Sequence, residues 1–524
     1  MRDVYLQEGF LYELNDLVSL FGFNIADNEE AKSFNKLLKL LKQKRLLKTR
    51  KIKGAIESLE DDESLISEDD YDFNDYIGTE SSNKQYIFRF VGMAFYKDII
   101  INVYPKYIKD KNRLPEKMRQ VMRVIKKHQK KVYKFLVPAM LEDSEKGNEI
   151  SLLSIILFLV EDYATNGVYC EMQKIREYNG SGEILWQETV DTTYPIFQNR
   201  KPIYVNTINM KTIHNQYNIF HRLHKYVLTE ASLQLEKYNL TDTLGLATLE
   251  LSDDELSTFG NLEYILDCLE KESAQQFNDH KLVVLKAISI YLKKKYLDVE
   301  INAISSEENF EFIGTRAFYR VWEDVIDDVY ISHKNIKMGD IKSKYVPKFE
   351  YTIKLPNGSF EYIQHEQRLG QIIEKPEWYL RDETKTYHNY YPKETFIPDY
   401  LHINNSNDMF YIMDAKYYVP NWYIDKFGVG HIEKQPGVED VVKQYMYYLV
   451  YKPLLENNGI DIKKVKNYYV MPTEGENEDV GYAKFDFLSK IITDVFDIRV
   501  KKLNAEELFS KYLSGVNDDV ENIP

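Results

Sequence analysis

The sequence predicts an α/β protein, α+β overall, whose C-terminal part is a mixed sheet flanked by helices. Helical and strand-like periodicities alternate over residues 301–510, and this alternation is typical of helices layered on a mixed sheet. With 44% hydrophobic and 14% aromatic residues, the chain can bury large cores and is not disordered. Its 524 residues correspond to two to four domains at roughly 100–200 residues each.

Changes in composition and periodicity divide the chain into four parts. Residues 1–110 predict a small α+β domain, because a helical apolar stripe is followed by two strand-like runs. Residues 111–300 predict a mostly helical region with a β insertion near Gly180. Residues 301–510 form the α/β domain, and we expect the polar residues 511–524 to be a flexible tail.

The candidate site lies in a predicted hairpin of the third part. Two apolar, strand-like runs, 396–403 and 409–413, flank a polar turn. Asp414 and Lys416 are two residues apart and share a face of the second strand, and Asp399 lies on the first strand. Two carboxylates suit a hard cation such as Mg²⁺, and a neighbouring lysine can orient a water. The layout indicates metal-assisted phosphodiester hydrolysis; the alternative is a surface hairpin with an incidental ion pair.

The charge distribution bears on the partners of the chain. The formal net charge of −15 is awkward for a protein that binds DNA alone, because such proteins normally present a basic surface. Basic stretches at 36–53 and 117–131 are either nucleic-acid contacts, solvated helix faces or contacts to an acidic partner. Either a local basic surface of this chain contacts the DNA, or a partner makes most of the DNA contacts.

Two further features indicate the compartment. The only cysteines are Cys170 and Cys268, which fits a reducing cytoplasm and excludes a cysteine-based zinc site. The sequence has no run of about 18 uncharged apolar residues, and its first residues lack the apolar core of a signal peptide. We therefore expect a cytoplasmic protein with no membrane span.

The hairpin motif resembles that of a nuclease superfamily. Pro398-Asp399 followed by Asp414-Ala415-Lys416 is similar to the PD-(D/E)xK pattern. The resemblance implies that Asp399 and Asp414 are metal ligands and that Lys416 positions the attacking water and stabilises the charge on the phosphorane.

Two helices complete this resemblance. In the superfamily, a helix before the hairpin often carries a glutamate that points at the metal, and Glu323 in FYRVWEDV occupies that place as an outer-sphere or second metal ligand. Asp324 and Asp327 are alternatives to Glu323. The helix after the hairpin carries a Q-x-x-x-Y motif in some branches; here Gln444 and Tyr448 fit it, share a helix face and are implied to support the site.

Upstream segments narrow the resemblance to one family. The segments YIFRFVGMAFYKDIIINVYPKYI, GSGEILWQETVDTTYPIFQNRKPIYVN, FHRLHKYVLTE and GTRAFYRVWEDV look like the LlaJI restriction endonuclease family, whose members are similar to McrC, the nuclease subunit of McrBC-type systems. The resemblance covers roughly residues 80–475. It implies an Mg²⁺-dependent endonuclease subunit that cuts double-stranded DNA together with a McrB-like AAA+ GTPase. The sequence has no GxxxxGKS/T phosphate loop, so we expect this chain to bind no nucleotide.

Several alternatives remain open at this point. Residues 1–110 are a possible DNA or partner contact, and 111–300 are expected to dock on the partner. The same fold could also belong to a stand-alone type II restriction enzyme or a DNA-repair nuclease. A non-catalytic assembly subunit is the remaining alternative, although a scaffold has no need to keep a cluster of like charges.

Overall fold

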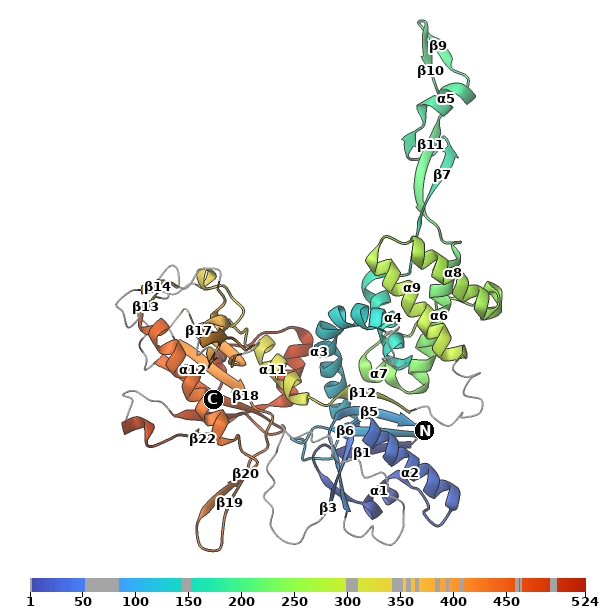
Figure 1. The fold of residues 1–524 in the computed structure, drawn as a ribbon. Coiled ribbons are helices and arrows are strands. Elements are labelled where there is room, and N and C mark those ends of the chain that lie inside the picture. Colours follow the sequence, from blue (N-terminus) through green and yellow to red (C-terminus); the bar gives the residue numbers. More distant parts are fainter. Residues whose placement is uncertain are drawn as a thin grey trace. The chain divides into compact units, whose positions relative to one another are not determined.

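A computed structural model shows the fold (Figure 1). It describes residues 2–51, 84–143, 152–297, 310–341, 352–354, 360–362, 367–381, 387–392, 395–404, 409–457, 461, 464–490 and 497–524. The chain forms two compact units. The first unit combines Met1–His128 with Gly314–Pro524, and the second is Gln129–Ile313. The sequence patterns predict boundaries at 110 and 300 and place the two ends of the chain in separate domains. In the structure, both ends belong to the first unit.

The N-terminal segment of the first unit contains two sheets. One has the strand order β1 (Arg2–Gln7), β6 (Ile99–Tyr104), β5 (Val91–Tyr96) and β12 (Phe310–Thr315). The other has the order β2 (Leu11–Glu13), β4 (Lys84–Phe88) and β3 (Leu47–Lys51). Helices α1 (Leu14–Phe21) and α2 (Asn28–Gln43) bury the apolar stripe predicted from the sequence, including Phe34, Leu37 and Leu41. Position 314 accepts only glycine, because an added Cβ would lie 2.3 Å from the carbonyl oxygen of Val91.

The C-terminal segment is built on a five-stranded mixed sheet. Its strand order is β17 (Tyr400–Asn404), β18 (Met409–Ala415), β21 (Val465–Thr473), β23 (Ile498–Asn504) and β22 (Glu478–Ala483). The central strands β18, β21 and β23 are parallel, and the two edge strands are antiparallel to their neighbours. This mixed sheet confirms the predicted fold class.

Two helices pack on this sheet. In α11 (Phe318–Val329), the indole Nε1 of Trp322 donates to the carbonyl oxygen of Val470 at 3.0 Å. In α12 (Val438–Asn457), Tyr451 packs with Phe410 and other sheet residues in one apolar core. Short hairpins flank the sheet strands in sequence: β13 (Thr352–Lys354) with β14 (Phe360–Tyr362), β15 (Trp378–Arg381) with β16 (Tyr387–Tyr390), and β19 (Asn421–Ile424) with β20 (Gly430–Glu433).

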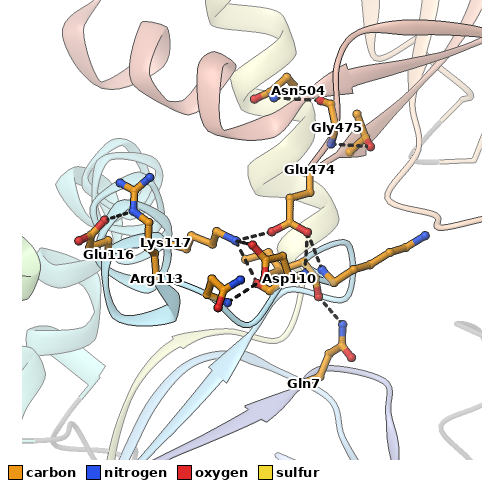
Figure 2. Close-up of polar contacts among 12 residues, drawn as sticks. Gln7, Asp110, Arg113, Glu116, Lys117, Glu474, Gly475 and Asn504 are labelled. Carbon is orange, nitrogen blue, oxygen red and sulfur yellow. Dashed lines mark hydrogen bonds and ion pairs between the residues drawn. The ribbon is translucent and has the colours of Figure 1, made fainter.

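Polar contacts join the two segments of the first unit. Glu474, just after β21, pairs with Lys117 of α3 (Leu114–Asp143) and accepts the backbone N–H groups of Lys109 and Asp110 at 2.9 and 2.8 Å (Figure 2). The chain turn that carries these groups is held from the other side by Gln7 of β1, whose Nε2 donates to the carbonyl oxygen of Ile108 at 2.7 Å. Residues near 110 therefore lie inside a unit and not at a domain boundary.

A second contact reaches the candidate site. Tyr417, which follows Lys416, donates its hydroxyl hydrogen to the Glu8 carboxylate and accepts the backbone N–H of Lys106 at 3.1 Å. Its ring packs against Tyr107 and Phe318. The N-terminal segment thus contributes to the surroundings of the strand that carries the D-x-K motif.

The C-terminal residues differ from the flexible tail predicted for 511–524. Helix α13 (Ala505–Ser514) is followed by the 3₁₀ turn η10 (Val520–Asn522). Val520 is 1% exposed, and the backbone N–H of Asp518 donates to the carbonyl oxygen of Val329 in α11 at 2.8 Å. The segment buries two apolar residues, Val520 and Ile523, and Asp518 also pairs with Lys511 of α13 at 2.7 Å.

The second unit is a helical body with a β insertion. Its helices are α4 (Leu152–Asn166), α6 (Ile219–Lys237), α7 (Leu240–Leu244), α8 (Leu262–Gln275) and α9 (Asp279–Leu292). The insertion contains β7 (Met172–Tyr178), β8 (Glu183–Ile184), α5 (Trp186–Thr192), β9 (Ile196–Gln198), β10 (Lys201–Ile203) and β11 (Ile208–His214). Within this unit, the insertion extends away from the helices as a long, thin arm (Figure 1). Among the described residues of the whole chain, no helix has both the length and the apolarity to cross a membrane.

Candidate active site

The predicted hairpin is formed by β17 and β18. The two strands are antiparallel, and Tyr400 lies opposite Met413. Asp399 immediately precedes Tyr400 and Asp414 immediately follows Met413, so both aspartates lie at the same end of the pair. The backbone N–H of Ala415 donates to Oδ2 of Asp399 at 2.9 Å, which fixes Asp399 against β18. The turn residues 405–408 lie outside the described residues.

Three acidic side chains influence one another electrostatically at this end of the hairpin. The carboxyl groups of Asp399 and Asp414 are close enough to share a hydrogen bond, and Glu323 of α11 interacts electrostatically with both. Burial raises the pKa of Asp399 well above its ordinary value, and the neighbouring charges of Asp414 and Glu323 raise it further. Burial and the charge of Asp414 likewise raise the pKa of Glu323 to about 7. The cluster therefore retains protons at a pH at which isolated carboxyl groups would be ionised.

Lys416 is held between two of the site's acids. Its Nζ lies 3.1 Å from Oδ2 of Asp414 and 2.8 Å from Oδ1 of Asp440. Burial opposes the positive charge, but Asp414 and then Asp440 outweigh burial and raise the pKa of Lys416 above its ordinary value. Lys416 is therefore a fixed cation, suited to orienting an anion or a water and unsuited to accepting a proton.

The structure distinguishes Glu323 from the two alternative acids. Asp324 pairs with Nδ1 of His128 at 3.2 Å and accepts the hydroxyl of Tyr512. Asp327 pairs with Nζ of Lys334 at 3.0 Å. Glu323 is the acid of this helix whose pKa responds to Asp414.

Helix α12 places a polar row beside the carboxyl cluster. Asp440, Gln444 and Tyr447 recur at helical spacing, and Asp440 contacts Lys416 directly. Gln444 is fully buried, and in the described part of the chain its Oε1 and Nε2 have no hydrogen-bond partner. The hydroxyl of Tyr447 donates to the carbonyl oxygen of Ile397 at 3.1 Å.

The Q-x-x-x-Y motif predicts a role for Tyr448, whereas the charges of the site act on Tyr447, and the sequence does not predict Asp440. Burial, followed by the charges of Asp414 and Asp399, raises the pKa of Tyr447. Tyr448 is buried in the apolar core with residues such as Leu369, and its support for the site stays a prediction. Asp440 was not predicted, although its position four residues before Gln444 places the two on one helix face.

The chemistry of this cluster fits a divalent cation. Asp399, Asp414 and Glu323 supply carboxylate oxygens, which are the ligands that Mg²⁺ takes in proteins. Burial, and then the charge of Asp414, raises the pKa values of Asp399 and Glu323, and a bound cation would favour their ionised forms. Within the residues that the structure describes, no three acidic, histidine or cysteine side chains are already spaced as a metal-binding group.

Comparisons with known proteins identify the family of the chain. The family model of the LlaJI restriction endonuclease matches residues 90–361 and 358–501. The type II restriction enzyme BsuMI component YdjA of Bacillus subtilis (strain 168) is 25% identical over 448 residues, which are 83% of each chain.

Two solved assemblies from Thermococcus gammatolerans also contain similar chains. A half-complex of McrB AAA+ hexamers with bound McrC matches over 98% of this chain and 99% of that chain, at 12% identity and a TM-score of 0.34. The McrBC complex matches over 58% and 88% respectively, at 14% identity and a TM-score of 0.20. The family model spans well over half of the sequence, and this match shows that the chain belongs to the LlaJI restriction endonuclease family.

Proposed function

We propose that this chain is the DNA-cutting subunit of a restriction system and hydrolyses phosphodiester bonds of double-stranded DNA with Mg²⁺. One observation carries the proposal. In a chain of a restriction endonuclease family, Asp399, Asp414 and Glu323 lie near the half-buried cation Lys416 at one end of a hairpin.

Each residue has a distinct task in this proposal. Asp399, Asp414 and Glu323 would hold the Mg²⁺ ion, which when bound polarises the phosphate and lowers the pKa of a water. Lys416 supplies a fixed positive charge where negative charge develops on the phosphate, and charge placed in advance in this way lowers the barrier. Asp440 keeps the Lys416 ammonium in position through their 2.8 Å contact.

A second subunit, a McrB-like AAA+ GTPase, is part of the proposal. The net charge of −15 opposes a polyanion, which makes strong DNA binding by the chain alone unfavourable. The relative from Bacillus subtilis is itself named as one component of an enzyme. In the second unit, the arm exposes large apolar side chains, among them Tyr194 (96%) and Phe197 (70%), and such exposure is typical of a protein-binding surface. This supports the docking role expected for residues 111–300.

The test is a cleavage assay on the purified full chain. Plasmid DNA and Mg²⁺ are incubated in three separate mixtures. The first contains the chain alone, the second contains only the AAA+ protein encoded by the neighbouring gene, and the third contains both proteins and GTP. We expect efficient cutting only in the complete mixture. Efficient cutting by the isolated chain, unaffected by partner or GTP, would favour the stand-alone type II enzyme. Absence of cutting in the complete mixture would favour a non-catalytic assembly subunit.

A further inference from the structure

The β19–β20 ribbon is the hairpin that follows the D-x-K strand. β19 begins at Asn421, five residues after Lys416, and pairs antiparallel with β20. Among the described residues, no third strand joins these two. In Figure 1 the ribbon, drawn in orange, projects from the C-terminal sheet. The short connection ties its position to that of Lys416.

The ribbon has almost no core of its own. Its large apolar side chains are exposed: Trp422 (48%), Tyr423 (43%), Ile424 (75%), Phe427 (78%) and Val429 (54%). An isolated two-stranded hairpin is only marginally stable in water. A group of exposed apolar side chains on such an element indicates a surface that a partner covers.

The turn of the ribbon is nevertheless well ordered by one side chain. Oδ1 of Asp425 accepts the backbone N–H groups of Phe427 and Val429, each at 2.9 Å. Its Oδ2 lies 2.9 Å from Nε2 of His431 on the opposite strand. Gly428 takes the left-handed conformation at the tip, with φ of +81°. The tip is thus pre-organised to present Lys426 and Phe427, which reduces the entropy lost on binding.

The ribbon carries equal numbers of acids and lysines, but within this described segment the lysines do not pair with the acids. Both of its acids are engaged internally, Asp425 in the turn and Glu433 as acceptor of the Tyr423 hydroxyl at 3.2 Å. In the part of the chain that the structure describes, Lys426 and Lys434 are paired with no carboxylate. The ribbon therefore combines an apolar surface with unpaired cations, in a chain whose overall charge is negative.

We propose that the β19–β20 ribbon enters the major groove of duplex DNA beside the cleaved phosphate. The inference rests on the proposed function and adds the element that contacts the bases. A two-stranded ribbon is one of the two elements that the major groove admits. Lys426 contacts a phosphate, and the exposed rings of Trp422 and Phe427 contact apolar base edges such as the thymine methyl group.

The test compares a tip variant with a matched control. The double variant Lys426→Ala/Phe427→Ala removes the tip, and Tyr482→Ala removes a ring that is 51% exposed on the edge strand β22 of the C-terminal sheet. DNA cleavage is measured under conditions in which the wild-type chain cuts, together with protection of guanine N7 from dimethyl sulfate. We expect the tip variant to raise KM for DNA about tenfold with kcat little changed, and to lose N7 protection next to the cut. The control should match the wild type.

Each outcome decides between the possibilities. Unchanged KM and N7 protection in the tip variant, with a wild type that cuts, would overturn the inference and leave the proposed function standing. Loss of AAA+ partner binding with DNA contacts intact would assign the ribbon to a protein surface and also overturn it. A wild type that neither binds nor cuts DNA would remove the proposed function and the inference together. If the tip variant unfolds at a lower temperature than the wild type, Trp422→Ala in the strand repeats the test with the turn intact.

Discussion

Two half-buried carboxyl clusters in the same unit are built in opposite ways. At Glu474, burial raises the pKa, but the Lys117 ammonium and the N–H groups of Asp110 and Lys109 lower it below its ordinary value (Figure 2). At Asp399 and Glu323, acids face acids, and both pKa values rise. The first cluster supplies a donor for each charge and stabilises the fold. The second places acids against one another, which disfavours their ionised forms, and perturbed carboxyl groups of this kind are common at functional sites.

The largest expected effect is on catalysis. Lys416→Ala should lower DNA cleavage by roughly 10²–10³-fold or more while the protein stays folded, because it removes the fixed cation at the phosphate. Lys501→Ala is the matched control, since Lys501 is another lysine of this unit that pairs with an aspartate and lies 2.7 Å from Asp479. Plasmid cleavage and thermal unfolding of both variants are the measurements. Normal cleavage by Lys416→Ala would refute its role.

The next effect concerns the response to metal. Mg²⁺ that binds only the folded protein should add about 2.7 kcal/mol to the free energy of unfolding when its free concentration is a hundred times the Kd. Asp414→Asn should abolish this gain, and Glu474→Gln should preserve it. Unfolding curves at pH 8 with Mg²⁺ or with EDTA measure the difference. An equal gain in Asp414→Asn would place the ion elsewhere.

The pH dependence of stability should separate the two clusters further. The folded pKa of Glu323 is about 7, above its ordinary value of 4.5, so the folded chain binds this proton more tightly than the unfolded chain. Stability without metal should therefore fall as pH rises from 4.5 to about 7. Glu323→Gln should remove this loss and stabilise the protein at pH 8 by about 2 kcal/mol. If the Glu323→Gln protein is only as stable as the wild type at pH 8, the raised pKa of Glu323 in the folded chain is contradicted.

The smallest effect is expected at Glu474. Glu474→Gln should lower the free energy of unfolding at neutral pH by about 1–2 kcal/mol, because the amide no longer pairs with Lys117 as a charge. The pKa of Glu474 is lowered, so this contribution is present above the ordinary pKa of 4.5 and is lost as pH falls below it. Chemical denaturation at pH 7 and at pH 3.5 tests both statements. Cleavage activity should be unchanged, which contrasts Glu474 with the acids of the candidate site.

Local patterns predicted the sheet and its hairpin, but not the long-range contacts. Two β-prone runs around a polar turn were enough to place β17 and β18, since register and side-chain alternation are local properties. Asp440 was missed because its contact with Lys416 depends on how α12 packs against the sheet. The Q-x-x-x-Y spacing favoured Tyr448, whereas the three-residue step from Gln444 brings Tyr447 under the influence of Asp414.

Local patterns also could not predict the limits of the two compact units, which differ from the boundaries expected at 110 and 300. Contacts such as Lys117 with Glu474, 357 residues apart, leave no mark on composition or periodicity. The tail was expected to be flexible because most of its residues are polar, yet Val520 is buried. A short apolar contact in a polar segment is too small a signal to be read from the sequence alone. The catalytic and metal-binding roles of the site residues stay predictions.

The first unit is made from both ends of the chain, with the second unit inserted between His128 and Gly314. This arrangement dictates an order of events on the ribosome. Domains fold as their residues emerge, so the inserted unit can complete its core while β1, β5 and β6 still lack their C-terminal partners. Glu323, Asp399, Asp414 and Lys416 all emerge after it. Helix α13 and the turn η10 pack against α11, so residues from 505 onwards support the helix that carries Glu323. A chain stopped before Gly314 would therefore contain the second unit but none of the four residues of the candidate site.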